Sequence, residues 1–487
     1  MRLRLFVVCS MLILAAAFPA FGIFICAIIL AIQIALMCLR PIIACLPARL
    51  VTGQQDVAVP QFSIHVAIHS EPPALVIRTL RGLLNQDWPS SGYEIIVMDN
   101  NTVDPALWKP VQKFCAAQSN RLVFKHQTGV QGAKAGALNI ALEHTDPLAT
   151  HVVTVDADYV VHHNFLSLAA GALRRTGADY VQFPQSYTAT ATVAPGIDAE
   201  LEEYFRTNAA VADEAEALLL TGTLCVISKD ALITAGGWSG STTTEDAELG
   251  VRLCNAGYSG RFINQVVGQG LLPFSLKDLE KQRYRWCSGN FQTLLRHIGT
   301  ILMPSATFSL HKRLVVVSQL TAWFHLALIP CALLVVWLVA GQGNTVGSTL
   351  AAGIIVLGLC DNAIRVLVRG LRDRLPLAVL LNALACRIAL APQSAKASFD
   401  AMAGGRLQFV VTDKSGGKSH SASNLHIWHL LLFVTVIALM VVTQPNNPLV
   451  FSALLTLALP LPAALVTEKS LRAYRETIVP SMREAIA

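Results

Sequence analysis

The stretch THVVTVDADY, residues 150–159, decides how the central part of the chain folds. A short β-rich run ends in Asp156-Ala157-Asp158, which places two carboxylates directly after a buried strand. Comparable β-rich runs lie at 62–70, 93–101, 121–127, 180–185 and 222–228. Helical segments at 73–85 and 132–143 alternate with these runs. This alternation predicts an α/β domain with a largely parallel, doubly wound sheet.

Polar residues gather where the predicted strands end. The first strand is followed by His69 and Glu71, the second contains Asp99 near its end, and the fourth leads into Asp156 and Asp158. Because ligands of doubly wound sheets bind beyond the carboxyl ends of the strands, we expect these side chains to share one site. A D-x-D pair suits Mg²⁺ or Mn²⁺ clamped to a diphosphate. The alternative is an acidic turn without a ligand, and Asp99 also fits ordinary turn chemistry.

One further motif precedes the D-x-D strand in the sequence, and another follows it. GAKAGALN, residues 132–139, opens a helix with Lys134 in its first turn, where free N–H groups attract phosphate. TTTEDAELGVRL, residues 242–253, places Glu245 and Asp246 at the start of an amphipathic helix. A carboxylate held there can act as a general base, or it can simply stabilise the helix start. The sequence has no G-x-G-x-x-G motif and no Walker lysine loop, which argues against dinucleotide and P-loop sites.

A third motif, QRYRWCSGN at 282–290, sets Gln282, Arg285 and Trp286 within one helical turn. Arg suits forked contacts with phosphate, and Trp offers a flat apolar face for a sugar ring. The alternative is an amphipathic helix at a bilayer surface, where Trp and Arg are common.

The composition predicts a membrane protein, since 53% of the 487 residues are hydrophobic and only 14% are charged. A charge-free run at 5–39 can form one long helix or two shorter spans broken near Pro19. Four further spans are predicted at about 315–340, 346–368, 427–443 and 449–466. The apolar segment 375–390 contains Pro376 and Arg387, which favours an interfacial helix.

The lysines and arginines orient these spans. They collect at 2–4, 40–49, 312–313, 365–374, 414–418 and 469–472, which the positive-inside rule assigns to the cytoplasm. We therefore predict an N-terminal transmembrane hairpin over 1–50, a cytoplasmic domain over 51–300 and a four-span region over 301–487, in the inner (plasma) membrane. These flanking cations explain most of the net charge of +6, so no nucleic acid is implied. The eleven cysteines contain no C-x-x-C pair and indicate neither a disulfide framework nor a zinc site.

The order of the motifs resembles that of the processive family 2 glycosyltransferases, which include cellulose, curdlan, chitin and hyaluronan synthases. The series runs from Asp99 through KAGALN, D-x-D, T-E-D and Q-x-x-R-W to the membrane spans, and covers about 62–470. The resemblance implies a Rossmann-like GT-A fold, a UDP-sugar donor, Mg²⁺ or Mn²⁺, and a growing polysaccharide as acceptor. It also implies a single displacement that inverts an α-linked donor into a β-linkage.

On the donor side, the resemblance assigns uridine contacts to Glu71 and Asp99, with His69 where the family often has an aromatic residue. Lys134 would contact the diphosphate, and Asp156 with Asp158 would bind nucleotide and metal.

On the acceptor side, Asp246 would be the catalytic base, with Glu245 beside it at the acceptor. Gln282, Arg285 and Trp286 would close the site around the pyrophosphate and the acceptor sugar.

The strip FVVTDKSGG, residues 409–417, lies between two predicted spans on the cytoplasmic side. Phe409, Val411, Thr412 and Lys414 match the F-x-V-T-x-K-G pattern of cellulose-synthase-type enzymes, with Ser415 in place of the glycine. In that family the loop closes over the loaded nucleotide, which implies contacts of Thr412 and Lys414 with the diphosphate. The alternative is an ordinary basic loop beside the membrane.

This strip favours a β-glucan, cellulose- or curdlan-like, made from UDP-glucose, because hyaluronan and chitin synthases generally lack the pattern. Thr221 and Gly222 depart from the Phe-Cys-Gly run that related cellulose synthases tend to have, which leaves the acceptor fit open. The alternatives are a synthase that uses UDP-N-acetylglucosamine, a transferase of one sugar to a lipid, and a transporter or binding module without catalysis. We expect accessory or export subunits as further partners, since no regulatory domain follows Arg472.

Overall fold

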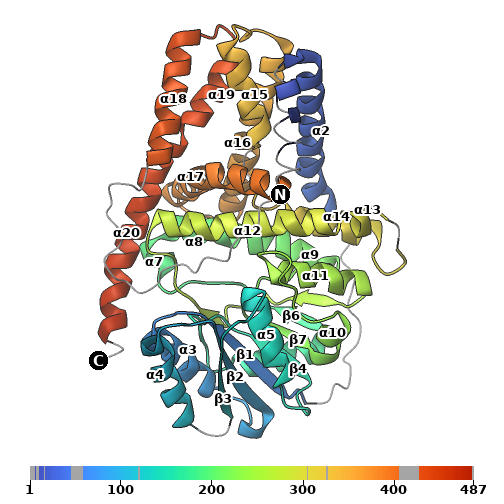
Figure 1. The fold of residues 1–487 in the computed structure, drawn as a ribbon, viewed down its shortest axis with the longest axis vertical. Helices are drawn as coiled ribbons and strands as arrows, with labels where there is room; N and C mark the ends of the chain where they lie inside the picture. Colours follow the sequence, from blue (N-terminus) through green and yellow to red (C-terminus); the bar gives the residue numbers. More distant parts are fainter. Residues whose placement is uncertain are drawn as a thin grey trace.

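In the computed structural model, a seven-stranded sheet forms the centre of the lower part of the molecule (Figure 1). The structure describes residues 6, 10–11, 13–15, 17–44, 59–118, 121–303, 305–324, 327–404 and 427–484. The strand order is β3-β2-β1-β4-β7-β6-β8. The strands are β1 (Phe62–Ile68), β2 (Tyr93–Asn100), β3 (Leu122–Gln127), β4 (His151–Thr154), β6 (Tyr180–Gln182), β7 (Cys225–Ser228) and β8 (Gly260–Phe262). All of the predicted strands form.

The pairing of these strands is mostly parallel. Strand β1 pairs in parallel with β2 and β4, β2 with β3, and β6 with β8, whereas β7 runs antiparallel to β4 and β6. A separate two-stranded ribbon joins β5 (Val160–Val161) to β9 (Gly268–Gln269). The prediction of a largely parallel α/β sheet is therefore confirmed.

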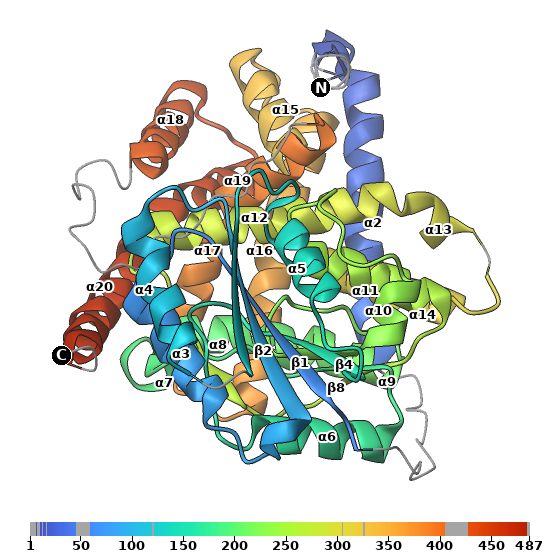
Figure 2. The ribbon, with the colours of Figure 1, turned by 60° about the horizontal axis from the view of Figure 1, so that its bottom comes forward.

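Helices cover both faces of the sheet (Figure 2). Ile95 and Val97 of β2 belong to the same buried cluster as residues of α3 and α4, whereas Ile96 and Met98 cluster separately with residues of α5. A strand buried on both faces needs such a continuous apolar run. The helices are α3 (Pro73–Leu84), α4 (Pro105–Ala116), α5 (Ala133–Glu143), α6 (Phe165–Thr176), α10 (Lys229–Thr234) and α11 (Glu245–Ala256).

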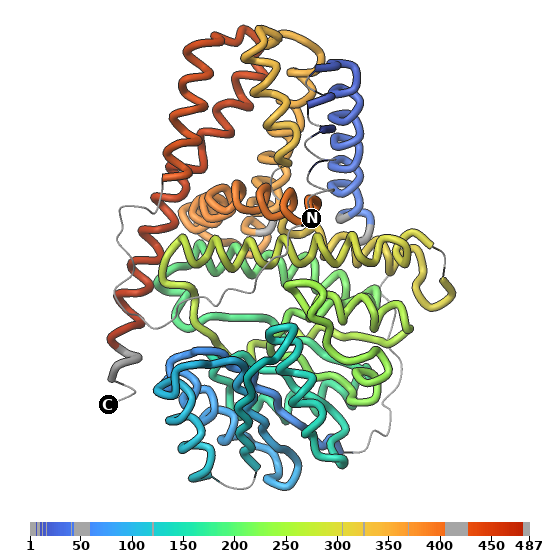
Figure 3. Tube along the Cα trace, viewed as in Figure 1, coloured from blue at the N-terminus to red at the C-terminus, as the bar shows by residue number. Residues whose placement is uncertain are grey.

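A layer of helices lies between the α/β domain and the long helices above it (Figure 3). The longest is α12 (Leu276–Arg296), which carries the predicted Q-x-x-R-W motif and packs against α17. The others are α7 (Thr190–Val193), α8 (Pro195–Tyr204), the π-helical turn η2 (Phe205–Ala209), α9 (Ala210–Glu214), α13 (Ile298–Leu302) and α14 (Leu310–Leu320).

The upper part of the molecule consists of apolar helices. They are α2 (Pro19–Ala44), α15 (Leu328–Val339), α16 (Val346–Arg372), α17 (Leu377–Met402), α18 (Ile427–Thr443) and α19 (Pro448–Ala458). Helix α20 (Pro460–Glu484) continues downward beside the α/β domain (Figure 1), where Tyr474 Oη accepts a hydrogen bond from Leu272 N at 3.2 Å. Within the described residues, four helical segments are long and apolar enough to cross a membrane: Pro19–Leu39, Val346–Arg372, Leu377–Met402 and Pro448–Pro480. Helix α2 begins at Pro19, where the sequence predicted a break.

The prediction of one continuous span at 315–340 is wrong. The segment forms two short helices, and α14 packs on the α/β domain through the buried Val315, Val316 and Leu320. The cause is polar: Gln319 accepts a hydrogen bond from Leu219 N at 2.9 Å and donates one to Ala217 O at 2.8 Å. These contacts commit α14 to the domain, which leaves only the twelve residues of α15 above it.

The predicted interfacial segment 375–390 is part of α17, which extends to Met402. By length and composition α17 could cross a membrane. Figure 1 shows it lying across the long helices instead, against α12. The position of this helix at a membrane interface stays a prediction.

A buried cluster of four charged side chains joins α8, α12 and α17. Arg283 Nη2 lies 2.7 Å from Glu200 Oε2, and Arg387 Nη2 lies 2.8 Å from Glu203 Oε2. Arg387 Nε also lies 3.6 Å from Glu200 Oε1. None of the four residues is more than 3% exposed. Because a charge at this depth needs an opposite charge beside it, the cluster fixes α17 on the α/β domain.

Replacing Arg387 by Leu removes the guanidinium that lies 2.8 Å from Glu203 Oε2 and 3.6 Å from Glu200 Oε1. We expect a loss of about 3–5 kcal/mol in the free energy of unfolding, because an uncompensated charge stays buried. The measurement is the thermal unfolding midpoint of the detergent-solubilised chain. Arg174→Leu, on the exposed side of α6, is the control and should change stability by no more than about 0.5 kcal/mol. Equal midpoints for both variants would contradict a structural role for the cluster.

Candidate active site

A cavity of about 1080 Å³ opens beyond the carboxyl ends of β1, β2 and β4. Its wall combines the β1–α3 loop, the D-x-D turn, the start of α11 and one side of α12. All but one of the predicted site residues in the described part of the chain line it. They are His69, Glu71, Lys134, Asp156, Asp158, Glu245, Asp246, Gln282, Arg285 and Trp286.

Asp99 is the exception, because the structure does not bring it into the cavity. It is 1% exposed, its Oδ2 lies 2.5 Å from His126 Nδ1, and its Oδ1 accepts a hydrogen bond from Thr102 Oγ1 at 2.5 Å. Trp108 stacks on the ring of His126 with 4.2 Å between centroids. The carboxylate is thus occupied by structural partners. No pattern around Asp99 indicates this pairing, because His126 lies on the neighbouring strand β3.

The neighbours Asn100 and Asn101 line the cavity in place of Asp99. Asn101 has a φ of +58°, a conformation that Asn tolerates better than most residues. Its side chain exchanges two hydrogen bonds with the backbone of Val130, at 2.9 and 3.0 Å. Asn101 therefore ties the end of β2 to the loop before α5. Sequence reasoning treated both asparagines only as turn residues.

The β1–α3 loop forms one end of the cavity. His69 Nδ1 lies 2.5 Å from Asn100 O, and the His69 N–H donates to Glu71 Oε2. Ser70, between them, has a φ of +62°. Non-glycine residues in this conformation are strained and concentrate at functional sites. The loop therefore holds both predicted nucleotide contacts in a fixed arrangement.

Lys134 stands at the centre of the charged groups. Its Nζ lies 2.5 Å from Asp156 Oδ1, 2.9 Å from Gly222 O and 3.7 Å from Glu245 Oε1. Burial alone would lower the pKa of Lys134, but the carboxylates of Asp156 and Glu245 outweigh it and raise the pKa. Lys134 is therefore a permanent cation facing the D-x-D turn. A diphosphate in the cavity would meet this charge.

The D-x-D turn fits a divalent cation whose remaining ligands are waters and phosphate oxygens. The side chain of Asp156 is 35% exposed, and Asp158 Oδ2 accepts a hydrogen bond from Leu271 N at 3.2 Å. No group of three or more His, Cys, Asp or Glu residues suited to a metal occurs in the part of the chain that the structure describes. Two carboxylates match Mg²⁺ or Mn²⁺, because these ions commonly keep waters and phosphate oxygens in their shell.

Asp246 lies at the start of α11, beside the cavity. Burial, and next the charge of Glu245, raise the pKa of Asp246 to about 7. Lys134, the N–H of Ala247 at 2.8 Å and Arg285 act in the opposite direction. A carboxylate with a pKa near neutrality is suited to accept a proton from a hydroxyl group. The geometry and the pKa together make Asp246 the candidate base.

Helix α12 closes the cavity on the side of the apolar helices (Figure 1). Gln282, Arg285 and Trp286 line it from one helical turn, as predicted. Thr243 Oγ1 donates to Arg285 O at 3.2 Å, which joins the helix to the loop before α11. The Arg283 guanidinium lies 4.8 Å from the ring of Trp286.

A second, smaller cavity of about 40 Å³ adjoins Asp246 and Trp286 on the side away from the D-x-D turn. Tyr204, Asn290 and Trp323 line it. Asn290 ends the QRYRWCSGN motif but was given no role there, and no motif surrounds Tyr204 or Trp323. This space is too small for a sugar ring, and its aromatic side chains pack on one another, since Tyr204 stacks on Trp323 with 5.0 Å between the ring centroids.

The predicted loop residues Phe409, Val411, Thr412 and Lys414 lie outside the described residues. Helices α17 and α18 are the nearest described elements on either side. The contacts of these four loop residues with a nucleotide therefore stay predictions.

Comparisons with known proteins agree with this site. The model for glycosyl transferase family 2 matches residues 63–235, and that for glycosyl transferase family group 2 matches residues 151–341. Among curated relatives, glucomannan 4-beta-mannosyltransferase 7 of Arabidopsis thaliana is 27% identical over 51% of this chain and 48% of its own. A cellulose synthase 1 catalytic subunit of Komagataeibacter xylinus is 24% identical over 54% of this chain and 35% of its own. The chain thus spans half or less of these relatives' lengths.

A solved structure, the mannosyltransferase PcManGT of Pyrobaculum calidifontis with GDP-Man and Mn²⁺, is similar in fold. It covers 78% of this chain and 99% of its own, with a TM-score of 0.53 and 16% identity. The sheet, the D-x-D turn and these matches define a glycosyltransferase of the GT-A fold. Residues 63–341 match the family 2 glycosyltransferase models, and the curated relatives of the chain include catalytic subunits of cellulose synthases.

Replacing Gly222 by Ala should disable the site. Gly222 has a φ of +83°, and a Cβ there would lie 2.7 Å from Asp246 Oδ2. Gly129, with a φ of +75° and no atom within 4 Å of such a Cβ, is the matched control. We expect both alanine variants to lose about 1–2 kcal/mol of stability through the left-handed backbone. Only Gly222→Ala should also lower sugar transfer, by about 100-fold, because it displaces the base.

Stability is measured by thermal unfolding and transfer by nucleotide release. Equal transfer rates for the two variants would contradict the contact between Gly222 and the base.

Proposed function

We propose that the chain polymerises a β-glucan, cellulose- or curdlan-like, from UDP-glucose and moves the growing polymer across the membrane. The observation that carries this proposal is the position of Asp246, whose pKa of about 7 suits a base. It adjoins the cavity that contains the D-x-D turn and the smaller cavity lined by Trp286.

The reaction follows from these positions. Asp246 accepts the proton of the acceptor's terminal hydroxyl, and the freed oxygen attacks the anomeric carbon of the donor sugar. The bond from that carbon to the UDP oxygen breaks, while Lys134 and Arg285 stabilise the negative charge on UDP. A divalent cation, held by Asp156 and Asp158, would neutralise part of the diphosphate charge.

The acceptor side supports a sugar chain. Trp286 lines the main cavity together with Asp246, and its aromatic ring is the surface that we assign to the acceptor sugar. Apolar helices rise directly above α12 (Figure 1), which supports export of the product through this part of the chain. The cytoplasmic orientation of the α/β domain, in an inner (plasma) membrane, and any accessory or export subunits belong to the same proposal.

A second candidate is transfer of mannose. Asp99 does not line the cavity, so the geometry gives no support to the uridine contact that the resemblance implies for it and leaves the base of the donor nucleotide open. The similarity to a glucomannan mannosyltransferase supports the same alternative. A synthase that uses UDP-N-acetylglucosamine, and a transferase of one sugar to a lipid, stay as further alternatives.

The proposed function is tested by donor choice. Membranes that contain the chain are incubated with UDP-glucose, UDP-N-acetylglucosamine or GDP-Man, and nucleotide release is followed. We expect release from UDP-glucose and a product that linkage-specific glucanases digest. Release from GDP-Man alone would favour the second candidate, and no release from any donor would overturn the proposal.

Asp246→Asn is the matched variant in this assay, and it should reduce release to background while UDP binding is retained. Equal loss of binding and release would reduce Asp246 to a structural role.

Transfer should depend on pH through Asp246. The base must be ionised, so kcat/KM should fall on the acid side with an apparent pKa of about 7. Because the charge of Glu245 raises that pKa, Glu245→Gln should move the acid limb to lower pH. Rates are measured in buffers of constant ionic strength. A profile that stays flat from about pH 5 to about pH 8 would contradict Asp246 as the base.

A further inference from the structure

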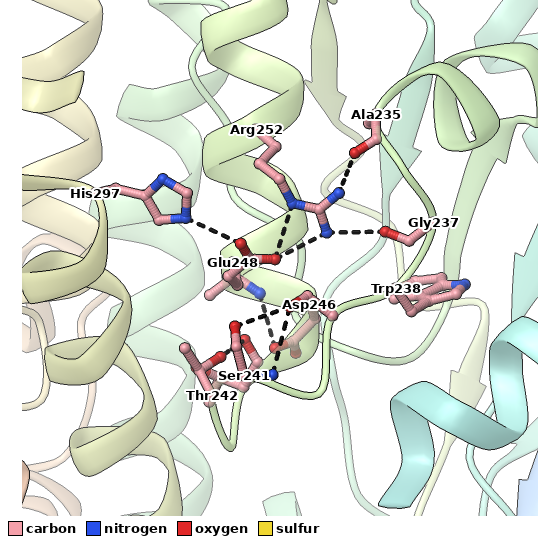
Figure 4. A network of polar contacts seen from close by, with 12 residues as sticks. Ala235, Gly237, Trp238, Ser241, Thr242, Asp246, Glu248, Arg252 and His297 are labelled. Carbon is pink, nitrogen blue, oxygen red and sulfur yellow. Dashed lines mark hydrogen bonds and ion pairs between the residues drawn. The ribbon is translucent and has the colours of Figure 1, made fainter. Parts of the chain in front are cut away.

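Glu248 lies two residues after Asp246 on α11 and is almost completely buried. Its Oε2 accepts hydrogen bonds from Arg252 Nε at 2.9 Å, and lies 2.8 Å from Arg252 Nη2. Its Oε1 lies 2.9 Å from His297 Nε2 (Figure 4). Burial alone would raise the pKa of Glu248, but the hydrogen bonds from His297 and Arg252 lower it. The carboxylate is therefore ionised and fully engaged.

Arg252 extends this network to the turn before the T-E-D loop. Its Nη2 donates to Gly237 O at 2.8 Å, and its Nη1 donates to Ala235 O (Figure 4). Next to this turn, Trp238 N donates to Asn139 Oδ1 at 2.8 Å, and Asn139 Nδ2 donates to Trp238 O at 2.8 Å. The loop that leads to Asp246 is thus held from α11 and from α5.

His297 extends the network in the other direction. It is the residue that ends α12, the helix that carries Gln282, Arg285 and Trp286. The same two helices approach closely at Gly289, where a Cβ would lie 2.6 Å from Thr244 Oγ1 and 2.7 Å from Thr243 Oγ1. Glu248 therefore connects the helix of the base to the helix of the leaving-group residues.

We propose that Glu248 is a positioning residue, which sets the place of Asp246 relative to α12 through His297 and relative to the 235–237 turn through Arg252. The proposal rests on the proposed function, in which Asp246 is the base and Arg285 stabilises UDP. An ordinary Glu–Arg pair within one helix would not need a partner from a second helix. Here His297 contacts the carboxylate from outside α11, and Arg252, which lies on α11, also binds the 235–237 turn.

The first test is Glu248→Gln in the full chain, in membranes. The amide keeps the shape but cannot accept from Arg252 and His297 together without turning a donor toward one of them. We expect kcat to fall by about 10- to 100-fold, because small displacements of a base are costly, while KM for the donor and UDP binding change little. The acid limb of the pH profile should also move, since the surroundings of Asp246 change.

Two matched controls separate positioning from general damage. Asp213→Asn breaks a comparable pair in the same domain, in which Arg261 Nε lies 2.7 Å from Asp213 Oδ1, and should leave kcat unchanged. His297→Gln keeps an N–H donor for Glu248, whereas His297→Ala removes it. We expect His297→Ala to reproduce the loss of kcat and His297→Gln to restore most of it.

Hydrogen–deuterium exchange of residues 235–250 gives a readout that does not need turnover. Glu248→Gln should speed exchange there, and Asp213→Asn should not. Unchanged exchange and an unchanged kcat in Glu248→Gln would overturn the proposal. So would equal losses of kcat in Glu248→Gln and Asp213→Asn. If the unaltered chain transfers no sugar, the proposed function fails, and the exchange result still decides whether Glu248 holds this loop.

Discussion

The arrangement of α8, α12 and α17 depends on a buried ionic cluster that joins them. Its members are Arg283, Glu200, Glu203 and Arg387. Four buried charges are tolerated only while each keeps an opposite charge beside it. The three helices that supply them therefore cannot shift independently. Arg283 belongs to the same helical turn as Gln282 and Arg285, which face the main cavity. The position of α12 above the cavity is therefore set by its contacts with α8 and, through Glu200, with α17.

The charges inside the cavity are balanced in a similar way. One cation, Lys134, contacts Asp156 and Glu245 and also lowers the pKa of Asp246. Because burial and the charge of Glu245 act more strongly in the other direction, the pKa of Asp246 is raised to about 7. A single lysine thus serves two purposes, holding a charge for a diphosphate and limiting how far the pKa of the base rises. The base and the donor side of the site are electrostatically coupled.

Most of the fold and most of the site could be predicted because they depend on local patterns. The strand runs, the D-x-D turn and the helix starts at Lys134 and Glu245 each follow from neighbouring residues, and ten predicted side chains meet in one cavity. The failures depend on distant partners. Asp99 is turned away by His126 from the next strand, and α14 is detached from its predicted span by Gln319. No pattern within either segment reports such a partner.

The motifs do not build the site by themselves, because three of their segments must approach more closely than side chains usually allow. Gly222 leaves room for Asp246, and Gly289 of α12 leaves room for Thr243 and Thr244 just before it. The charge of Glu248 then acts across the junction that these glycines permit. The positions of the T-E-D and Q-x-x-R-W motifs matter for this reason. Moving either motif by one residue would separate a glycine from the group that it accommodates. The geometry of the base is thus a property of backbone contact as much as of the carboxylate itself.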